Sequence, residues 1–228
     1  MITGKYPNLR LRRTRKYSWS RKLVQENNLS CNDLIYPIFL IEGKNRKQAI
    51  KSMPGIYKHS IDQLGMIINN AIKSKIPMVA LFPSTPKNKK DEYGSEALNE
   101  NNLVCKAIRF IKKRFKNNIG IMTDVALDPY TSHGQDGIID TDGYIINDVT
   151  NDVLLKQALS HAEAGSDIVA PSDMMDGRIK IIRKGLEKEK FYNTKILSYS
   201  AKYASSFYGP FRDAVGSISA LGKADKKT

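Results

Sequence analysis

The segment Ile119-Gly120-Ile121-Met122-Thr123-Asp124-Val125-Ala126 is short and almost wholly apolar, with one acidic side chain near its end. Runs of this kind are typical of parallel strands that are covered on both faces. Four further runs share the pattern, namely residues 34–41, 78–82, 168–170 and 196–199. The sequence therefore predicts a sheet of five buried, parallel strands.

Helical patterns fill the intervals between these runs. In residues 61–74 the apolar side chains recur at the spacing of one helix face. Three further helices are predicted at residues 103–115, 153–164 and 179–186, the second of these ending at Gly165, a natural C-terminal cap. Because strands and helices alternate, the pattern indicates a parallel α/β architecture. The polar, proline-containing residues 83–99 are predicted to form a loop.

Five strands are too few for the closed eight-stranded barrel that parallel βα units often build, which takes about 250 residues. We therefore expect either a small open sheet or an incomplete barrel. Residues 1–30 are predicted to form a basic N-terminal arm, and residues 31–228 an incomplete (β/α) barrel domain. An unclosed barrel exposes strand edges, so we expect the isolated chain to be poorly soluble.

The chain carries a net charge of +14, and its first 22 residues hold eight basic side chains and no acidic one. Such an arm could bind nucleic acid, but no recognised binding motif accompanies the charge. The alternative is an extended arm that packs on a partner subunit, together with a lysine-rich compositional drift, which the abundance of Lys, Asn and Ile elsewhere favours. No apolar run approaches the roughly 18 residues of a membrane span, and no secretory signal follows the basic start. We expect a cytoplasmic protein with reduced, buried cysteines at Cys31 and Cys105.

The segment 198–212 places one lysine, Lys202, among small, hydroxylated and aromatic residues. Burial disfavours the charged form of a lysine, so we expect its pKa to be lowered. A neutral amine can form a Schiff base with a ketone, and Arg212 offers a forked donor for a substrate carboxylate. The alternative is a lysine whose stem packs on aromatic rings while its head reaches water.

Residues 124–137 place three acidic side chains and His133 in one loop after the third strand. Carboxylate oxygens suit a hard cation such as Mg²⁺, and the loop has no cysteine for a zinc–thiolate site. Alternatively, the aspartates and glycines only form turns, and His133 is a structural hydrogen-bonding residue.

Residues 170–178 follow the fourth strand and should face the same site. There, Ser172 could line the site, or Ser172 or Asp173 could cap the next helix. The aromatic residues Tyr203, Phe207, Tyr208 and Phe211 could belong to the core or to a hydrophobic lid, and we expect a mixture.

Residues 124–137, 170–178 and 198–217, together with Met53-Pro54-Gly55, resemble the 5-aminolevulinic acid dehydratase (porphobilinogen synthase) family. The resemblance runs from about Arg12 to Thr228. Members of this family condense two 5-aminolevulinate molecules into porphobilinogen, on the route to haem and other tetrapyrroles. The resemblance implies a (β/α)8 TIM barrel, here with about the first five βα units. It also implies an N-terminal arm that embraces a neighbouring copy, typically in an octamer.

The resemblance also assigns roles to residues. It implies that Lys202 is one of two Schiff-base lysines and that Arg212 and Lys226 hold a substrate carboxylate. It places Asp124, Ser172 and Phe211 in the substrate pocket.

Zinc-dependent members carry three cysteines in the loop after the third strand. Here Ala126, Asp128 and Asp136 stand at those places. The chain therefore resembles the magnesium-type branch, with Asp128 and Asp136 as expected metal ligands.

The family pattern continues beyond Thr228 with three more strands, the second Schiff-base lysine and the allosteric magnesium ligand. We therefore expect either a partial porphobilinogen synthase sequence or a shortened gene product. The alternatives are a degenerate protein that keeps only assembly surfaces, a Schiff-base lyase that needs one lysine, and a basic nucleic-acid binder.

Overall fold

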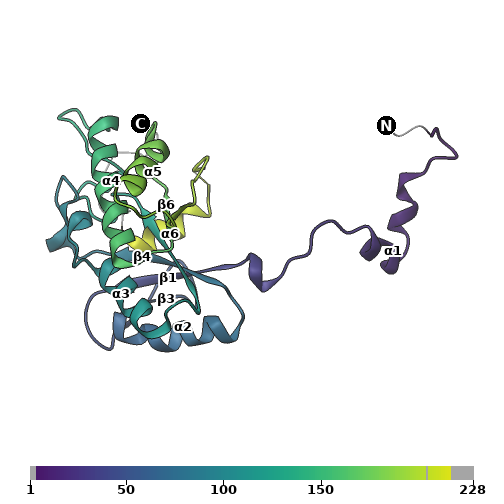
Figure 1. The fold of residues 1–228 in the computed structure, drawn as a ribbon, viewed down its shortest axis with the longest axis horizontal. Coiled ribbons are helices and arrows are strands. Elements are labelled where there is room, and N and C mark those ends of the chain that lie inside the picture. The colour runs from purple at the N-terminus through teal and green to yellow at the C-terminus, as the bar shows by residue number, and fades with distance from the viewer. Residues whose placement is uncertain (1–3, 204, 217–228) are drawn as a thin grey trace.

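The computed structural model describes residues 4–203 and 205–216. Its described strands form one sheet in the order β2-β3-β1-β4-β5-β6-β7 (Figure 1). All neighbouring strands are parallel except β2 and β3. The strands are β1 Ile35–Ile41, β2 Lys47–Ala49, β3 Tyr57–His59, β4 Met78–Ser84, β5 Gly120–Val125, β6 Ile168–Pro171 and β7 Lys195–Ile196. The predicted parallel α/β architecture is confirmed.

The described helices alternate with the strands along the chain. They are α1 Ser18–Leu23, α2 Leu64–Lys73, α3 Leu103–Phe115, α4 Asn147–Ala164, α5 Arg178–Lys188 and α6 Tyr208–Val215. Helix α4 ends at Gly165, whose φ of 107° is a left-handed conformation that glycine adopts without strain. Short 3-10 turns precede α2 and interrupt the loop between β4 and α3.

Alternate side chains of each strand face opposite sides of the sheet, as the pleat requires. Val79 and Leu81 of β4 pack with residues of α2 and α3, whereas Ala80 and Phe82 pack with residues of α6. Helices α4 and α5 continue the first layer over β5 and β6. We call the side covered by α2–α5 the outer face and the side beneath α6 the inner face.

Several elements differ from the sequence-based prediction, among them helices α1 and α6, which were not predicted. The short strands β2 and β3 were missed, because Lys47, Gln48, Lys58 and His59 give them no apolar run. Helix α4 begins six residues before the predicted start at 153, and β7 is only two residues long. Cys31 is exposed, so the prediction of two buried cysteines was wrong for it.

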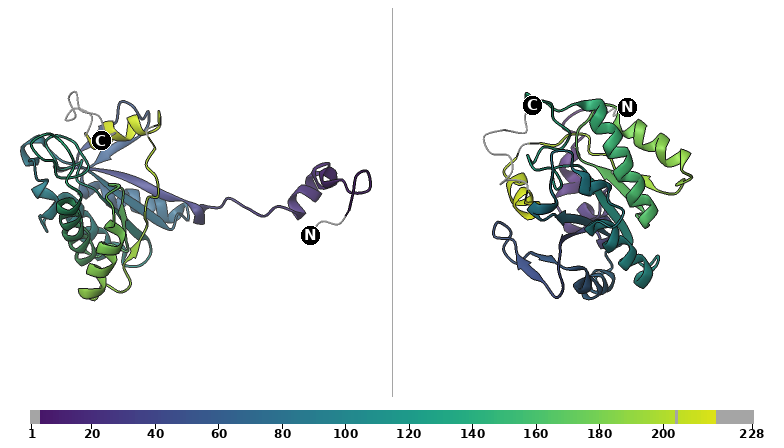
Figure 2. Two further views of the ribbon diagram at one scale, coloured as in Figure 1. Left: turned by 90° about the horizontal axis from the view of Figure 1, so that it is seen from above. Right: turned by 90° about the vertical axis from the view of Figure 1, so that its left-hand side faces the viewer.

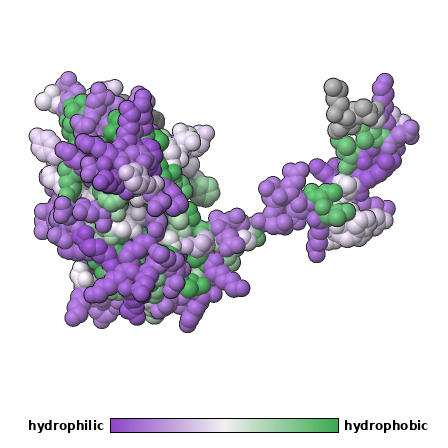
Figure 3. Space-filling model, viewed as in Figure 1, coloured by the Kyte–Doolittle hydropathy of each residue, from purple (hydrophilic) through white to green (hydrophobic). Residues whose placement is uncertain are grey.

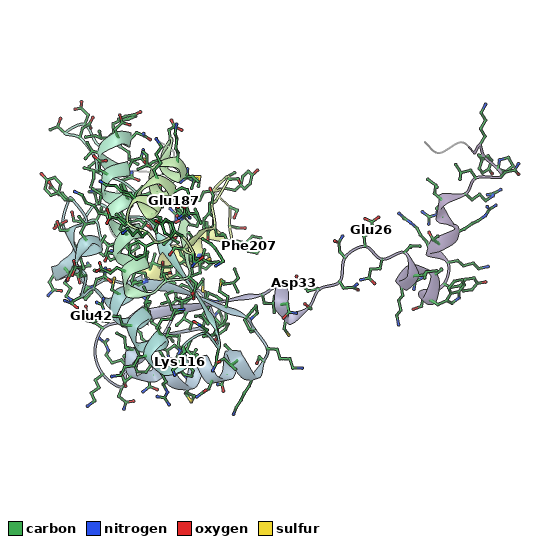
Figure 4. The ribbon with its side chains drawn as sticks, viewed as in Figure 1. Glu26, Asp33, Glu42, Lys116, Glu187 and Phe207 are labelled. Carbon is green, nitrogen blue, oxygen red and sulfur yellow. The ribbon has the colours of Figure 1, made fainter. Side chains whose placement is uncertain are left out.

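The sheet of the described residues does not close into a barrel, since β2 and β7 are its two edges. Residues 4–34 extend away from the sheet as an arm, seen from two further sides in Figure 2 and, at Glu26 and Asp33, in Figure 4. Hydrophobic residues appear in green on the arm in Figure 3. The large exposed apolar and aromatic side chains of the arm are Tyr6, Leu11, Tyr17, Trp19, Leu23, Val24 and Leu29. Within the described residues, no helix is long and apolar enough to cross a membrane.

Candidate functional site

The candidate site lies on the inner face, where β5, β6 and β7 end. Asp124 of β5 pairs in register with Ala170 of β6, and Ala170 packs on the inner face. Ser172 follows β6 and lies two residues beyond Ala170, so it returns to the same side. Parallel strands bring their carboxyl ends to one edge, which explains why residues far apart in the sequence meet here.

Asp124 and Ser172 form a hydrogen-bonded pair. The Ser172 hydroxyl donates to Asp124 Oδ1 at 2.7 Å. Burial raises the pKa of Asp124 to about 7. The hydrogen bond from Ser172 and the charge of Lys202 lower this pKa, but burial has the larger effect. Asp124 can therefore hold or release a proton near neutral pH.

The protonated state of Asp124 predicts a dependence of stability on pH. Because its pKa rises on folding from 3.8 to about 7, the native state binds a proton that the unfolded state has released between these values. The free energy of unfolding should therefore fall as pH rises from about 4 to 7. Asp124→Asn should remove this component, on the order of 2–4 kcal/mol at about 1.4 kcal/mol per pKa unit. Urea titrations of both proteins at several pH values measure it, and parallel pH profiles would contradict it.

Lys202 faces Asp136 across the site. Its Nζ lies 2.9 Å from Asp136 Oδ2, and the two side chains are 17 % and 9 % exposed. Burial lowers the pKa of Lys202, but Asp136, Asp128 and Tyr208 together outweigh it, so the pKa lies above its ordinary value. The expectation of a lowered pKa was therefore wrong: the amine is an ammonium until its proton is removed.

Helix α6 brings Arg212 and Phe211 to the same site. The Tyr208 ring lies near two cations, 5.3 Å from Lys202 Nζ and 5.1 Å from Arg212 Cζ, measured to the ring centroid. Asp213 fixes the helix by accepting hydrogen bonds from the backbone and hydroxyl of Ser52. Lys226, the other predicted carboxylate ligand, lies outside the described residues.

The aromatic residues of this segment lie partly in the core and partly at the surface, and a lid formed by the exposed ones stays a prediction. Phe211 packs edge-on against Phe82 at 4.9 Å between ring centroids, and also contacts Phe39. Tyr203 and Phe207 are 80 % and 88 % exposed, and Phe207 is labelled in Figure 4. An apolar pocket of about 390 Å³ lies beside this cluster. Phe211 thus forms a wall of the inner face.

The loop after β6 contains contacts that the sequence did not indicate. The cap of α5 is Gly177, and no side chain caps this helix, so the alternative that Ser172 or Asp173 caps it is wrong. Instead Asp173 Oδ1 accepts the backbone N–H of Met175. Arg178 donates to Tyr199 O at 2.8 Å, three residues before Lys202. The sequence feature that could have indicated this contact is the position of Arg178 at the end of the loop that follows β6.

Comparison with known proteins decides the family. The family model described as delta-aminolevulinic acid dehydratase matches residues 8–228. The chain belongs to the delta-aminolevulinic acid dehydratase family. The predicted resemblance is thereby confirmed.

Individual members of this dehydratase family match at high identity. The dehydratase of Bradyrhizobium diazoefficiens is 55 % identical over 220 residues, which are 96 % of this chain and 62 % of that protein. The dehydratase of Ruminiclostridium josui is 49 % identical over 90 % of this chain and 98 % of that protein. The chain thus spans less than two thirds of the length of the first relative.

A crystal structure of the dehydratase from Toxoplasma gondii ME49, in complex with its reaction product porphobilinogen, has the same fold. It superimposes with a TM-score of 0.90 at 42 % identity, covering 100 % of this chain and 63 % of that one. The described sheet therefore corresponds to part of a dehydratase barrel.

The two expected metal ligands, Asp128 and Asp136, lie at the same candidate site. In the part of the chain that the structure describes, no group of three or more His, Cys, Asp or Glu side chains could hold a metal ion. Asp136 Oδ2 instead accepts from Lys202. Metal binding by Asp128 and Asp136 stays a prediction, and we assign no chemical step to a metal.

His133 is held by backbone groups. Its Nδ1 accepts the backbone N–H of Gln135 at 3.1 Å, and its Nε2 lies 3.2 Å from Glu92 O. These contacts favour the structural interpretation of His133.

Proposed function

We propose that the protein acts as a porphobilinogen synthase in tetrapyrrole biosynthesis, with Lys202 forming a Schiff base with 5-aminolevulinate. The observation that carries the proposal is the placement of Lys202 Nζ 2.9 Å from a carboxylate, among the carboxyl ends of parallel strands. A largely buried amine beside a proton acceptor suits attack on a ketone. Family membership supports the same reaction.

The proposed first step is imine formation. The ammonium of Lys202 passes a proton to Asp136 Oδ2, its hydrogen-bond partner. The neutral Nζ then adds to the ketone carbon, and one Nζ hydrogen passes to the carbonyl oxygen to give a carbinolamine. This oxygen takes up a second proton and leaves as water, and the other Nζ hydrogen stays on the protonated C=N bond. Asp124, which exchanges a proton near neutral pH, is suited to deliver a proton to the departing oxygen.

The substrate carboxylate needs a cation at a distance from Lys202. Arg212 and Lys202 both lie near the Tyr208 ring, and we propose that the two cations contact one extended substrate. An arginine fork can bind a carboxylate through two parallel hydrogen bonds.

The reaction is tested by incubating the protein with labelled 5-aminolevulinate and measuring pyrrole formation and borohydride-stable adduct in parallel. We expect both. An adduct without pyrrole would indicate half of a two-lysine site or a single-lysine lyase. Absence of both, together with salt-sensitive nucleic-acid binding, would overturn the enzyme proposal. Repeating the assay with and without a chelator tests the magnesium prediction.

We also propose that the N-terminal arm packs on another copy of the chain in a homo-oligomer, an octamer by family resemblance. Trp19, Leu23 and Leu29 are 66 %, 78 % and 85 % exposed on the arm. A segment that presents several large apolar side chains to solvent is typical of an interaction surface.

Removal of the arm should reduce the size of the assembly. We expect a variant without residues 1–30 to elute at lower mass in size-exclusion chromatography with light scattering, because it loses the exposed apolar contacts. A matched control replaces Arg10, Arg12 and Arg13 with glutamine, which removes charge and keeps the apolar side chains. An unchanged mass in the truncated protein would contradict the proposed role of the arm.

A further inference from the structure

Arg178 connects two loops of the site. It is the first residue of α5, and its side chain is 12 % exposed. One guanidinium nitrogen donates to Met175 O at 2.9 Å, and the other donates to Tyr199 O at 2.8 Å. Its Nε lies 3.5 Å from Asp173 Oδ2. The fork therefore holds the loop after β6 with two contacts and the segment after β7 with one.

The loop after β6 is held in a strained conformation. Met174 has a φ of 78°, a left-handed value that is unusual for a bulky side chain. Such strain persists only where the surroundings enforce it. Asp173 Oδ1 binds the backbone of Met175, and Asn151 of α4 donates to Asp176 O at 2.8 Å. Arg178 adds a third contact to this loop, at Met175 O. Ser172, which donates to Asp124, is at the start of the same loop.

The segment after β7 is held at Tyr199. Its backbone N–H donates to Pro171 O at 3.4 Å, and its carbonyl accepts from Arg178. In the described part of the chain, the backbone hydrogen bonds from this segment to β6 end at Tyr199, three residues before Lys202. The anchor nearest to Lys202 on its N-terminal side is therefore shared with Arg178.

We propose that Arg178 is a positioning residue that fixes the loop after β6 and the segment after β7 as one unit, and so places Lys202 for reaction. This inference rests on the proposed Schiff-base role of Lys202. Lysine cannot replace the arginine fully, because an ammonium lacks the planar fork that reaches two carbonyl oxygens at once.

The chain offers a matched control in Arg183, also on α5. Its guanidinium donates to Thr194 O at 2.7 Å and Phe191 O at 3.3 Å, and it pairs with Glu187. It thus makes the same kind of contacts at the opposite end of β7, away from Lys202. A purely structural role would give Arg178 and Arg183 variants similar behaviour.

The test compares Arg178→Met, Arg178→Lys and Arg183→Met by the rate of borohydride-trapped adduct at Lys202 with 5-aminolevulinate. At saturating substrate we expect Arg178→Met to react about 10- to 100-fold more slowly, the loss typical of a misplaced reacting group. Arg178→Lys should recover part of this loss, and Arg183→Met should stay within about twofold of the unaltered protein.

A second variant distinguishes loss of positioning from loss of folding. Arg178→Met leaves Asp173, whose side chain is 0 % exposed, without its cation. Combining it with Asp173→Asn removes that buried charge and should leave the slow reaction in place. Equal rates in the Arg178 and Arg183 variants, or full recovery in the double variant, would overturn the proposal.

Hydrogen exchange separates this inference from the proposed function. If the unaltered protein forms no adduct at Lys202, the Schiff-base proposal fails, but peptides spanning residues 197–203 still report on the anchor. Faster exchange there in Arg178→Met than in Arg183→Met would support the positioning role. Equal exchange would overturn it.

Discussion

Replacing Lys202 with methionine should abolish the borohydride-stable adduct with 5-aminolevulinate. Methionine keeps an unbranched side chain for packing near Tyr208 but has no amine to attack the ketone. Since the C=N bond forms at Nζ, the expected effect is complete loss of adduct and not a reduced rate. Scintillation counting or intact mass measurement after reduction detects it.

The matched control is Lys112→Met. Lys112 Nζ lies 2.7 Å from Asp167 Oδ1, so it is also an ion-paired lysine, but it belongs to α3 on the outer face. We expect this variant to form the adduct at the rate of the unaltered protein. Retention of adduct in Lys202→Met, or equal loss in both variants, would contradict the assignment of the amine.

Replacing Asp136 with asparagine should lower the pKa of Lys202. Asp136 is its hydrogen-bond partner and a main cause of its raised pKa. Loss of an opposite charge at this distance lowers a lysine pKa by about 1–3 units. The amine then becomes neutral at lower pH, so the pH of half-maximal adduct formation should move down by about this amount. The maximal rate should also fall, because the proposed proton acceptor is lost.

The measurement is the pH profile of adduct formation, with Asp167→Asn as control. That variant removes the carboxylate partner of Lys112 and leaves the site intact. We expect its profile to match that of the unaltered protein. A profile of Asp136→Asn that stays in place would mean that Asp136 does not control the protonation of Lys202.

The fold could be predicted from the sequence wherever burial leaves an apolar pattern. Helix α3 was predicted with its observed limits, because its apolar residues recur at helical spacing and face the sheet. The structure adds that the side chain of Asn102 caps its first turn. The hairpin of β2 and β3 could not be predicted, because its side chains are largely polar and its pairing partner β1 provides the context. Local apolar patterns identify helices and strands with a buried face. They miss strands that form mainly through hydrogen bonds to neighbouring strands.

The site could be predicted only in part for a related reason. Composition singled out Lys202, but the charge that sets its pKa comes from Asp136, 66 residues away in the sequence. Local composition predicted a lowered pKa because it includes burial and omits distant carboxylates. Likewise, the contact between Arg178 and Tyr199 exists only because β6 and β7 are neighbours in the sheet.

The measurement that tests the central claim most directly is the location of the reduced 5-aminolevulinate adduct. The protein is incubated with the labelled substrate, reduced with borohydride and digested, and the modified peptide is sequenced by mass spectrometry. We predict that the label lies on Lys202, within the segment that follows β7. A label on another lysine, or none at all, would contradict the account.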